Sequence, residues 1–150
     1  MKLAAAFVLF LGACGGRLES VHGQKVHVGP GVPPDSVTAA LAMWNDAVGI
    51  DLAITDNSAL ATIAVTNATD CGANHLGYDD EDSSDAVICL ANFDSGAADP
   101  LVPVTIAHEL GHVMGLHHIA PATPALMNHD LGPQVITDAD VAQFRAAWPN

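Results

Sequence analysis

Positive charge is scarce in this chain. Only four of its 150 residues are Lys or Arg, against 17 Asp and Glu, so the formal net charge is −13. The four cations are spread along the sequence at Lys2, Arg17, Lys25 and Arg145. Binding a phosphate backbone requires clustered Lys and Arg, so this composition excludes nucleic acid as a partner. An acidic surface of this kind favours solubility and is compatible with bound calcium.

Long hydrophobic runs are absent as well. The apolar run from Leu3 to Leu11 is too short to span a bilayer as a helix, so we interpret it as part of a cleaved targeting signal. The residues up to Cys14, in LGAC, resemble the lipobox of bacterial lipoprotein signal peptides, in which the cysteine is acylated and becomes the mature N-terminus. Gly15 in place of Asp after that cysteine implies the outer membrane in an organism that has one. An ordinary secretory signal is the alternative, and either signal predicts export.

Cysteine is also rare. Apart from Cys14 the chain has only Cys71 and Cys89, and neither belongs to a CxxC pair of the kind that binds metals as thiolates. Disulfides persist in exported proteins, so we predict that Cys71 and Cys89 are bonded to each other. Closing the loop between them would stabilise the fold by roughly 3 kcal/mol in the chain-entropy model.

The length of the chain allows one domain, and half of its residues are hydrophobic, which is enough for a core of ordinary size. No internal repeat is visible in the sequence. We expect a lipoprotein signal peptide over residues 1–13, a tether over 14–24 and a single domain over 25–150.

Hydrophobic spacing predicts both helices and strands. Helices are expected over residues 35–49, from about Pro103 onward, and from Thr137 to Trp148, where Thr137 and Asp140 have nearly capping-box spacing. Period-two patterns and apolar runs predict strands over residues 25–28, 50–55, 61–66, 75–78 and 85–92. This order predicts an α/β (α+β) domain in which helices pack on one twisted sheet.

The most informative stretch is AHELGHVMGLHH. His108 and His112 are four residues apart and would share one face of a helix, where two neutral imidazoles can bind one zinc ion. Glu109 would then be placed to take a proton from a zinc-bound water. Gly115 can adopt a positive φ that ends the helix and turns the chain back, so that His118 reaches the metal as a third ligand.

These residues complete the pattern HExxHxxGxxH, for which a chance match is on the order of 10⁻⁵ per chain at average composition. The pattern resembles the long zinc motif of the metzincin clan of metallopeptidases. That resemblance implies a metzincin-like catalytic domain with a mainly parallel twisted sheet, an antiparallel edge strand, a zinc helix and a C-terminal helix. It also implies a methionine turn beneath the zinc, for which Met127 is suitably placed, although methionine more often just fills gaps in a core.

Within the clan the sequence is most similar to the matrixins, above all to compact bacterial members. The similarity includes the early helix with Trp44, HLGY as an edge strand lining the substrate cleft, and the final helix. The sequence departs from the family at Ile119, where many matrixins have serine, and at His129, where astacins and serralysins have a zinc-binding tyrosine. His129 either approaches the metal or is an exposed loop residue. No cysteine-containing propeptide is expected between Cys14 and the first strand.

Other residues are weaker candidates for metal binding or for lining the cleft. His117 competes with His118 as third ligand, although the family spacing favours His118, and His75 either borders the cleft or is simply exposed. An acidic cluster offers hard oxygen ligands for calcium, which matrixins commonly bind, at Asp79, Asp80, Glu81, Asp82 and Asp85. It lacks the ordered spacing of a recognised calcium loop, and a solvated run of charge is the alternative.

The sequence therefore predicts a monomeric zinc-dependent endopeptidase that hydrolyses extended polypeptide substrates and meets the membrane only through a lipid anchor at Cys14. A non-catalytic zinc-binding surface lipoprotein is the alternative. Retention of Glu109 argues against it, because a binding module needs metal ligands but no base. A metal-scavenging protein would instead carry dispersed or repeated runs of ligands.

Overall fold

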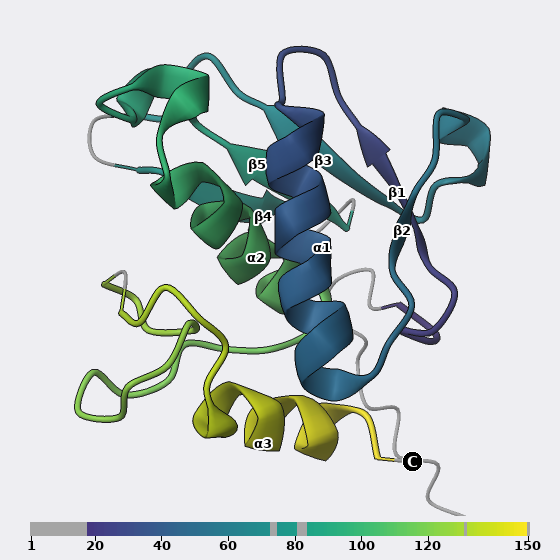
Figure 1. Ribbon diagram of the computed structural model, residues 1–150, viewed down its shortest axis with the longest axis vertical. Helices are drawn as coiled ribbons and strands as arrows, with labels where there is room; N and C mark the ends of the chain where they lie inside the picture. The colour runs from purple at the N-terminus through teal and green to yellow at the C-terminus, as the bar shows by residue number, and fades with distance from the viewer. Residues whose placement is uncertain (1–17, 73–74, 81–83, 131, 150) are drawn as a thin grey trace, which may run out of the picture.

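The computed structural model describes residues 18–72, 75–80, 84–130 and 132–149. These ranges contain one five-stranded sheet and three α-helices (Figure 1). None of the helices in these ranges is long and apolar enough to cross a membrane. The predicted signal peptide and Cys14 lie outside the described residues.

The sheet is mixed but mainly parallel, with the strand order β2-β1-β3-β5-β4. Its strands are β1 (Lys25–Val28), β2 (Ala53–Ile54), β3 (Ile63–Asn67), β4 (Gly77–Asp80) and β5 (Asp85–Ile88). All neighbours pair in parallel except the edge strand β4, which is antiparallel to β5. The acidic segment that joins β4 to β5 is too short for the crossover that parallel pairing requires, so the chain reverses. The predicted fold class, including the antiparallel edge, is confirmed.

The helices α1 (Pro34–Val48) and α2 (Leu101–Val113) lie side by side over one face of the sheet, and α3 (Asp138–Ala147) lies beyond their ends (Figure 1). Proline suits the first turn of α1 because its missing N–H would have no partner there. The helix ends at Gly49, which adopts the left-handed conformation with φ 74°. Thr137 and Asp140 form the predicted capping box at the start of α3.

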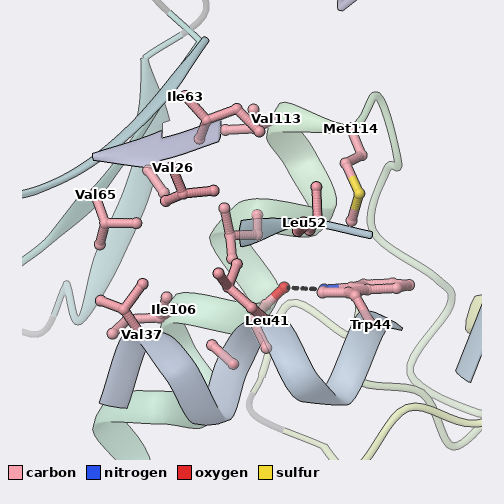
Figure 2. Close-up of a cluster of buried hydrophobic side chains, with 14 of the residues drawn as sticks. Val26, Val37, Leu41, Trp44, Leu52, Ile63, Val65, Ile106, Val113 and Met114 are labelled. Atoms are coloured by element: carbon pink, nitrogen blue, oxygen red, sulfur yellow. Dashed lines mark hydrogen bonds between the residues drawn. The ribbon is translucent and has the colours of Figure 1, made fainter. Parts of the chain in front are cut away.

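The core lies between α1, α2 and the sheet. The buried side of α1 packs on strand residues such as Val26 and Val65 (Figure 2). Trp44 of α1 is fully buried, and its indole N–H donates a hydrogen bond of 2.8 Å to the carbonyl of Ala107 in α2 (Figure 2). The core thus fixes α2 against both the sheet and α1, directly before the histidine motif begins.

Several predicted boundaries shift for local reasons. Of the strand predicted over 50–55 only β2 forms, because the side chain of Asn45 takes both the N–H and the carbonyl of Leu52. The strand predicted over 85–92 ends at Ile88, where the chain turns into a short 3-10 helix. The second helix begins at Leu101, so that Pro103 is its third residue, a position whose N–H would still lack a helical acceptor.

The disulfide between Cys71 and Cys89 is present, as predicted, and joins the segment after β3 to the residue that follows β5. The part of the expected tether that the structure describes packs against the domain. Val21 is only 2% exposed, Leu18 contacts the same core, and the Gly23 N–H donates to the carboxylate of Asp51. Residues 18–24 therefore lie on the domain rather than extending freely from it.

Candidate metal centre

The metal centre is built on α2, a helix that is buried for nearly all of its length. His108 and His112 lie one turn apart on it, and Gly111 between them allows a close approach from behind. A Cβ atom on Gly111 would lie 2.3 Å from the sulfur of Met127 and 3.2 Å from the indole of Trp44. The helix can therefore pack this tightly against Met127 and Trp44 only with glycine at this position.

A glycine turn then reverses the chain, as predicted. Gly115 has φ 83°, its N–H donates to the carbonyl of His112, and the Leu116 N–H donates to the carbonyl of Gly111. This pair of bonds is a Schellman motif, which needs a left-handed residue that glycine adopts without steric cost. Leu116 is buried behind the turn, and His118 is carried back toward the helix.

The Nε2 atoms of His108, His112 and His118 converge. They are separated by 3.2 Å for His108 and His118, and by 3.1 Å for each of the two pairs with His112. Nitrogens bound tetrahedrally to one zinc ion at about 2.05 Å lie about 3.3 Å apart. These three residues, here called the three-histidine cluster, therefore have the spacing of a zinc site.

The protonation of the two helical histidines also fits a metal. The Nδ1–H of His108 donates to the carbonyl of Leu126 at 2.8 Å, and that of His112 donates to the carbonyl of Leu116 at 2.9 Å. A carbonyl only accepts, so each Nδ1 carries the proton and each Nε2 presents a lone pair. Two lone pairs 3.1 Å apart repel each other unless a cation lies between them.

Burial favours the neutral form of His108 and of His118. The pKa of His108 is lowered to about 4, mainly by desolvation; the hydrogen bond to Leu126 opposes this shift, and the neighbouring imidazoles of His112 and His118 add to it. Desolvation also lowers the pKa of His118. Neutral imidazole is the form that binds zinc, so the cluster is prepared for a metal at neutral pH.

Glu109 lies beside the cluster and is 6% exposed. Gly77, at the start of β4, leaves room for it, because a Cβ atom there would lie 2.8 Å from Oε1 of Glu109. Burial raises the pKa of Glu109 to about 8, and the charge of Asp79 adds to the rise. A carboxyl group with a raised pKa next to a metal site is suited to accepting and returning a proton.

Met127 lies in a turn that is held in place from α3. The carboxylate of Asp140, which is completely buried, accepts hydrogen bonds from the backbone N–H groups of Leu126 and Met127, each at 2.9 Å. The same carboxylate accepts from the N–H and hydroxyl of Thr137. Because the Leu126 carbonyl is the acceptor for His108, Asp140 positions a histidine ligand through this turn.

Two further residues hold the segment from His117 to Met127 and were not anticipated from the sequence. The side-chain amide of buried Asn128 donates to carbonyls of the loop, including that of Ile119, and accepts from the Ala125 N–H. Gln143 on α3 accepts from the N–H of His117 and donates to its carbonyl. Of these positioning residues only Asp140 had a sequence signal, as part of the capping box; Gln143 and Asn128 had none.

The cluster opens into a cleft of about 570 Å³. Its lining comes from β4 and the residues before it, from α2, and from the loops carrying His118 and His129. The lining residues outside the three-histidine cluster are His75, Leu76, Gly77, Tyr78, Asp79, Thr105, Glu109, His129 and Asp130. His129 is exposed and its ring centroid lies 5.1 Å from that of His118. His75 borders the cleft, which is one of the two placements the sequence allowed.

The remaining candidate residues do not join the cluster. His117 is exposed, and its backbone is held by Gln143. Of the residues suggested for calcium, Glu81 and Asp82 lie outside the described part of the chain, and the calcium site stays a prediction. Asp79 instead takes part in the cleft.

Comparison with known proteins supports the fold. No family model matches the chain, and no curated protein matches its sequence. Among solved structures, the chain is similar to archaemetzincin from Archaeoglobus fulgidus complexed with malonate, with a TM-score of 0.53 and 16% sequence identity over 80% of this chain and 99% of that one. The domain therefore has a metzincin-like fold, and its three-histidine cluster has the ligand arrangement of a zinc site.

Proposed function

We propose that this protein is a zinc-dependent endopeptidase. The observation that carries the proposal is the convergence of three histidine Nε2 atoms, 3.1–3.2 Å apart, in a cleft that also exposes the Glu109 carboxyl group. Three protein ligands leave the fourth position of a tetrahedral zinc open, which distinguishes catalytic from structural zinc sites. The metzincin-like fold is consistent with this function.

In the proposed mechanism His108, His112 and His118 hold the metal. Zinc in such a site supplies Lewis-acid polarisation of a carbonyl and lowers the pKa of a water molecule. Glu109 accepts the proton of the attacking water and delivers it to the amine nitrogen that leaves. Its buried place in the cleft beside the three-histidine cluster supports both steps.

The substrate is proposed to bind along β4. This strand pairs with β5 on one side only and forms the edge of the sheet, next to Glu109. An extended peptide can therefore add to the free edge by backbone hydrogen bonds, which would bring a peptide bond close to Glu109. The sequence had suggested this role for HLGY, and the strand that forms begins at Gly77.

The narrower assignments remain proposals. A matrixin-like subtype rests on the sequence resemblance, and a lipid anchor at Cys14 rests on the lipobox-like LGAC. Export is supported by the disulfide between Cys71 and Cys89, because such bonds persist in oxidising compartments. We propose that the protein acts as a monomer on polypeptides, with residues 25–150 as the catalytic domain.

The test is cleavage of an unfolded protein substrate by the purified protein and by the Glu109→Ala variant, with zinc quantified in both. Both should bind about one zinc per chain, since Glu109 is not a ligand. Turnover by the variant should be lower by about 10²- to 10⁴-fold. Glu19→Ala, which removes an exposed glutamate outside the cleft, is the matched control and should leave turnover unchanged. If the unmodified protein binds zinc and cuts no member of a broad peptide set, the non-catalytic binding module becomes the better account.

A further inference from the structure

Asp79 lines the cleft, a placement that the acidic run in the sequence did not predict. Side chains two residues apart on a strand point to the same face, so Asp79 shares the face of Gly77, which contacts Glu109. Both residues line the cleft. The carboxylate of Asp79 forms no hydrogen bond or ion pair with any described residue, so its charge is available to a ligand.

The charged side chains among the described lining residues are acidic. Besides Asp79 and Glu109, Asp130 lines the cleft from the loop after the methionine turn, where it contacts the exposed ring of His129. The described residues that line the cleft include no Lys or Arg. Asp79 and Asp130 therefore have no cationic partner among these lining residues, and a cationic ligand group that reaches them is favoured.

A second feature, the hydroxyl group of Thr105, favours a polar ligand group in the cleft. Thr105 lies on its wall, one turn before His108, and is only 2% exposed. Its hydroxyl group has no hydrogen-bond partner among the described residues. An unsatisfied buried hydroxyl is costly, and a polar group of a bound ligand would relieve that cost where an aliphatic side chain would not.

We propose that the cleft selects polypeptide segments with lysine or arginine beside the bond to be cut, and that the Asp79 carboxylate is the main partner of the cationic side chain. This preference rests on the proposed peptidase function, because it concerns the same cleft. A carboxylate beside the metal excludes acidic segments by like-charge repulsion while it attracts basic ones, so one residue provides both halves of the selectivity.

The experiment uses fluorescent peptides that differ only in having Lys, Gln or Glu at one position, scanned over three places on either side of the cleaved bond. Binding is measured by anisotropy on the zinc-loaded Glu109→Gln protein, and kcat/KM is measured on the protein with Glu109 intact. Asp79→Asn is compared in both backgrounds with Asp46→Asn. Asp46 is exposed on α1 and does not line the cleft, so the control changes net charge equally.

At the preferred position we expect the Lys peptide to bind about tenfold more tightly than the Gln peptide, and the Glu peptide to bind most weakly. Asp79→Asn should reduce the Lys-to-Gln ratio to about twofold, Asp46→Asn should preserve it, and raising salt from about 0.05 M to about 0.5 M should diminish it. A Lys-to-Gln ratio that Asp79→Asn leaves unchanged would overturn the inference. Because binding requires no turnover, lack of cleavage would count against the proposed function alone.

Discussion

The three ligands of the cluster are supported in two different ways. His108 and His112 belong to one helix, and each has its Nδ1–H held by a backbone carbonyl. His118 belongs to a loop, is exposed, and has no hydrogen bond from Nδ1 among the described residues. Its position is set by hydrogen bonds of the residues on either side. The side chain of Gln143 accepts from the His117 N–H, and the Ile119 N–H donates to the Met127 carbonyl.

The site therefore consists of a rigid half, His108 and His112, and an assembled half, His118. The rigid half is fixed by helical geometry and by burial in the core, and it would persist as long as α2 is packed. The assembled half depends on α3, which holds two separate loops. Asp140 accepts hydrogen bonds from the turn that contains Met127, and Gln143 bonds to the backbone of His117, next to the ligand His118. Substitutions in α3 should therefore lower zinc affinity, even though α3 lies far from His108 and His112 in the sequence.

The largest effect should come from removing a ligand from each half. His108→Ala and His118→Ala should each lower zinc affinity by about 100-fold or more, beyond the loss expected for an outer hydrogen-bond partner. Without metal the two should differ. His108→Ala should lower the free energy of unfolding by about 2 kcal/mol, because it opens a cavity and leaves the Leu126 carbonyl without its donor, whereas exposed His118→Ala should change it by less than about 0.5 kcal/mol.

Zinc affinity is measured by titration against a competing chelator, and stability by urea denaturation of the metal-free proteins. Equal losses of metal-free stability in the two variants would contradict the division into a rigid and an assembled half.

A smaller effect is expected from Asp140→Asn. The amide keeps one acceptor oxygen but places an N–H₂ group against backbone donors, so the turn at Leu126 and Met127 loses part of its support. We expect the free energy of unfolding to fall by about 2 to 3 kcal/mol, and zinc affinity to fall by about tenfold. Asp138→Asn, an exposed change in the same first helical turn, should cost less than about 1 kcal/mol. Similar losses in the two variants would mean that Asp140 acts only as a charge near the end of the helix.

The smallest effect is expected from Gln143→Met, which keeps the length of the side chain and removes both hydrogen bonds to His117. Stability should change by less than about 1 kcal/mol, while zinc affinity should fall by up to about tenfold, because the loop that carries His118 is less restricted. Arg145→Met, an exposed change on the same helix, should leave zinc affinity unchanged. Unchanged zinc affinity in Gln143→Met would show that His118 needs no support from α3.

Much of the architecture was accessible from local patterns. Helical spacing and the glycine at its end predicted α1 almost to the residue, although the N-cap is Pro33 rather than Asp35 or Ser36, and the fold class followed from the order of the elements. The strand predictions were less accurate at their ends. Residues 50–55 have a strand-like pattern, but Asn45 from a different element takes the backbone groups of Leu52, a competition that no local pattern contains.

Local sequence patterns were enough to predict the site residues that lie within a few positions of one another. The spacing of His108, Glu109 and His112 and the turn at Gly115 follow from helical geometry and from the conformational freedom of glycine, which operate locally. Tertiary packing brings Asp79 and Gly77 of the edge strand next to Glu109, and it places Asp140 and Gln143 of the last helix against the loops near the metal site. Those contacts join residues far apart in the chain. They depend on how α2, α3 and the sheet pack together, which no local periodic pattern in the sequence specifies.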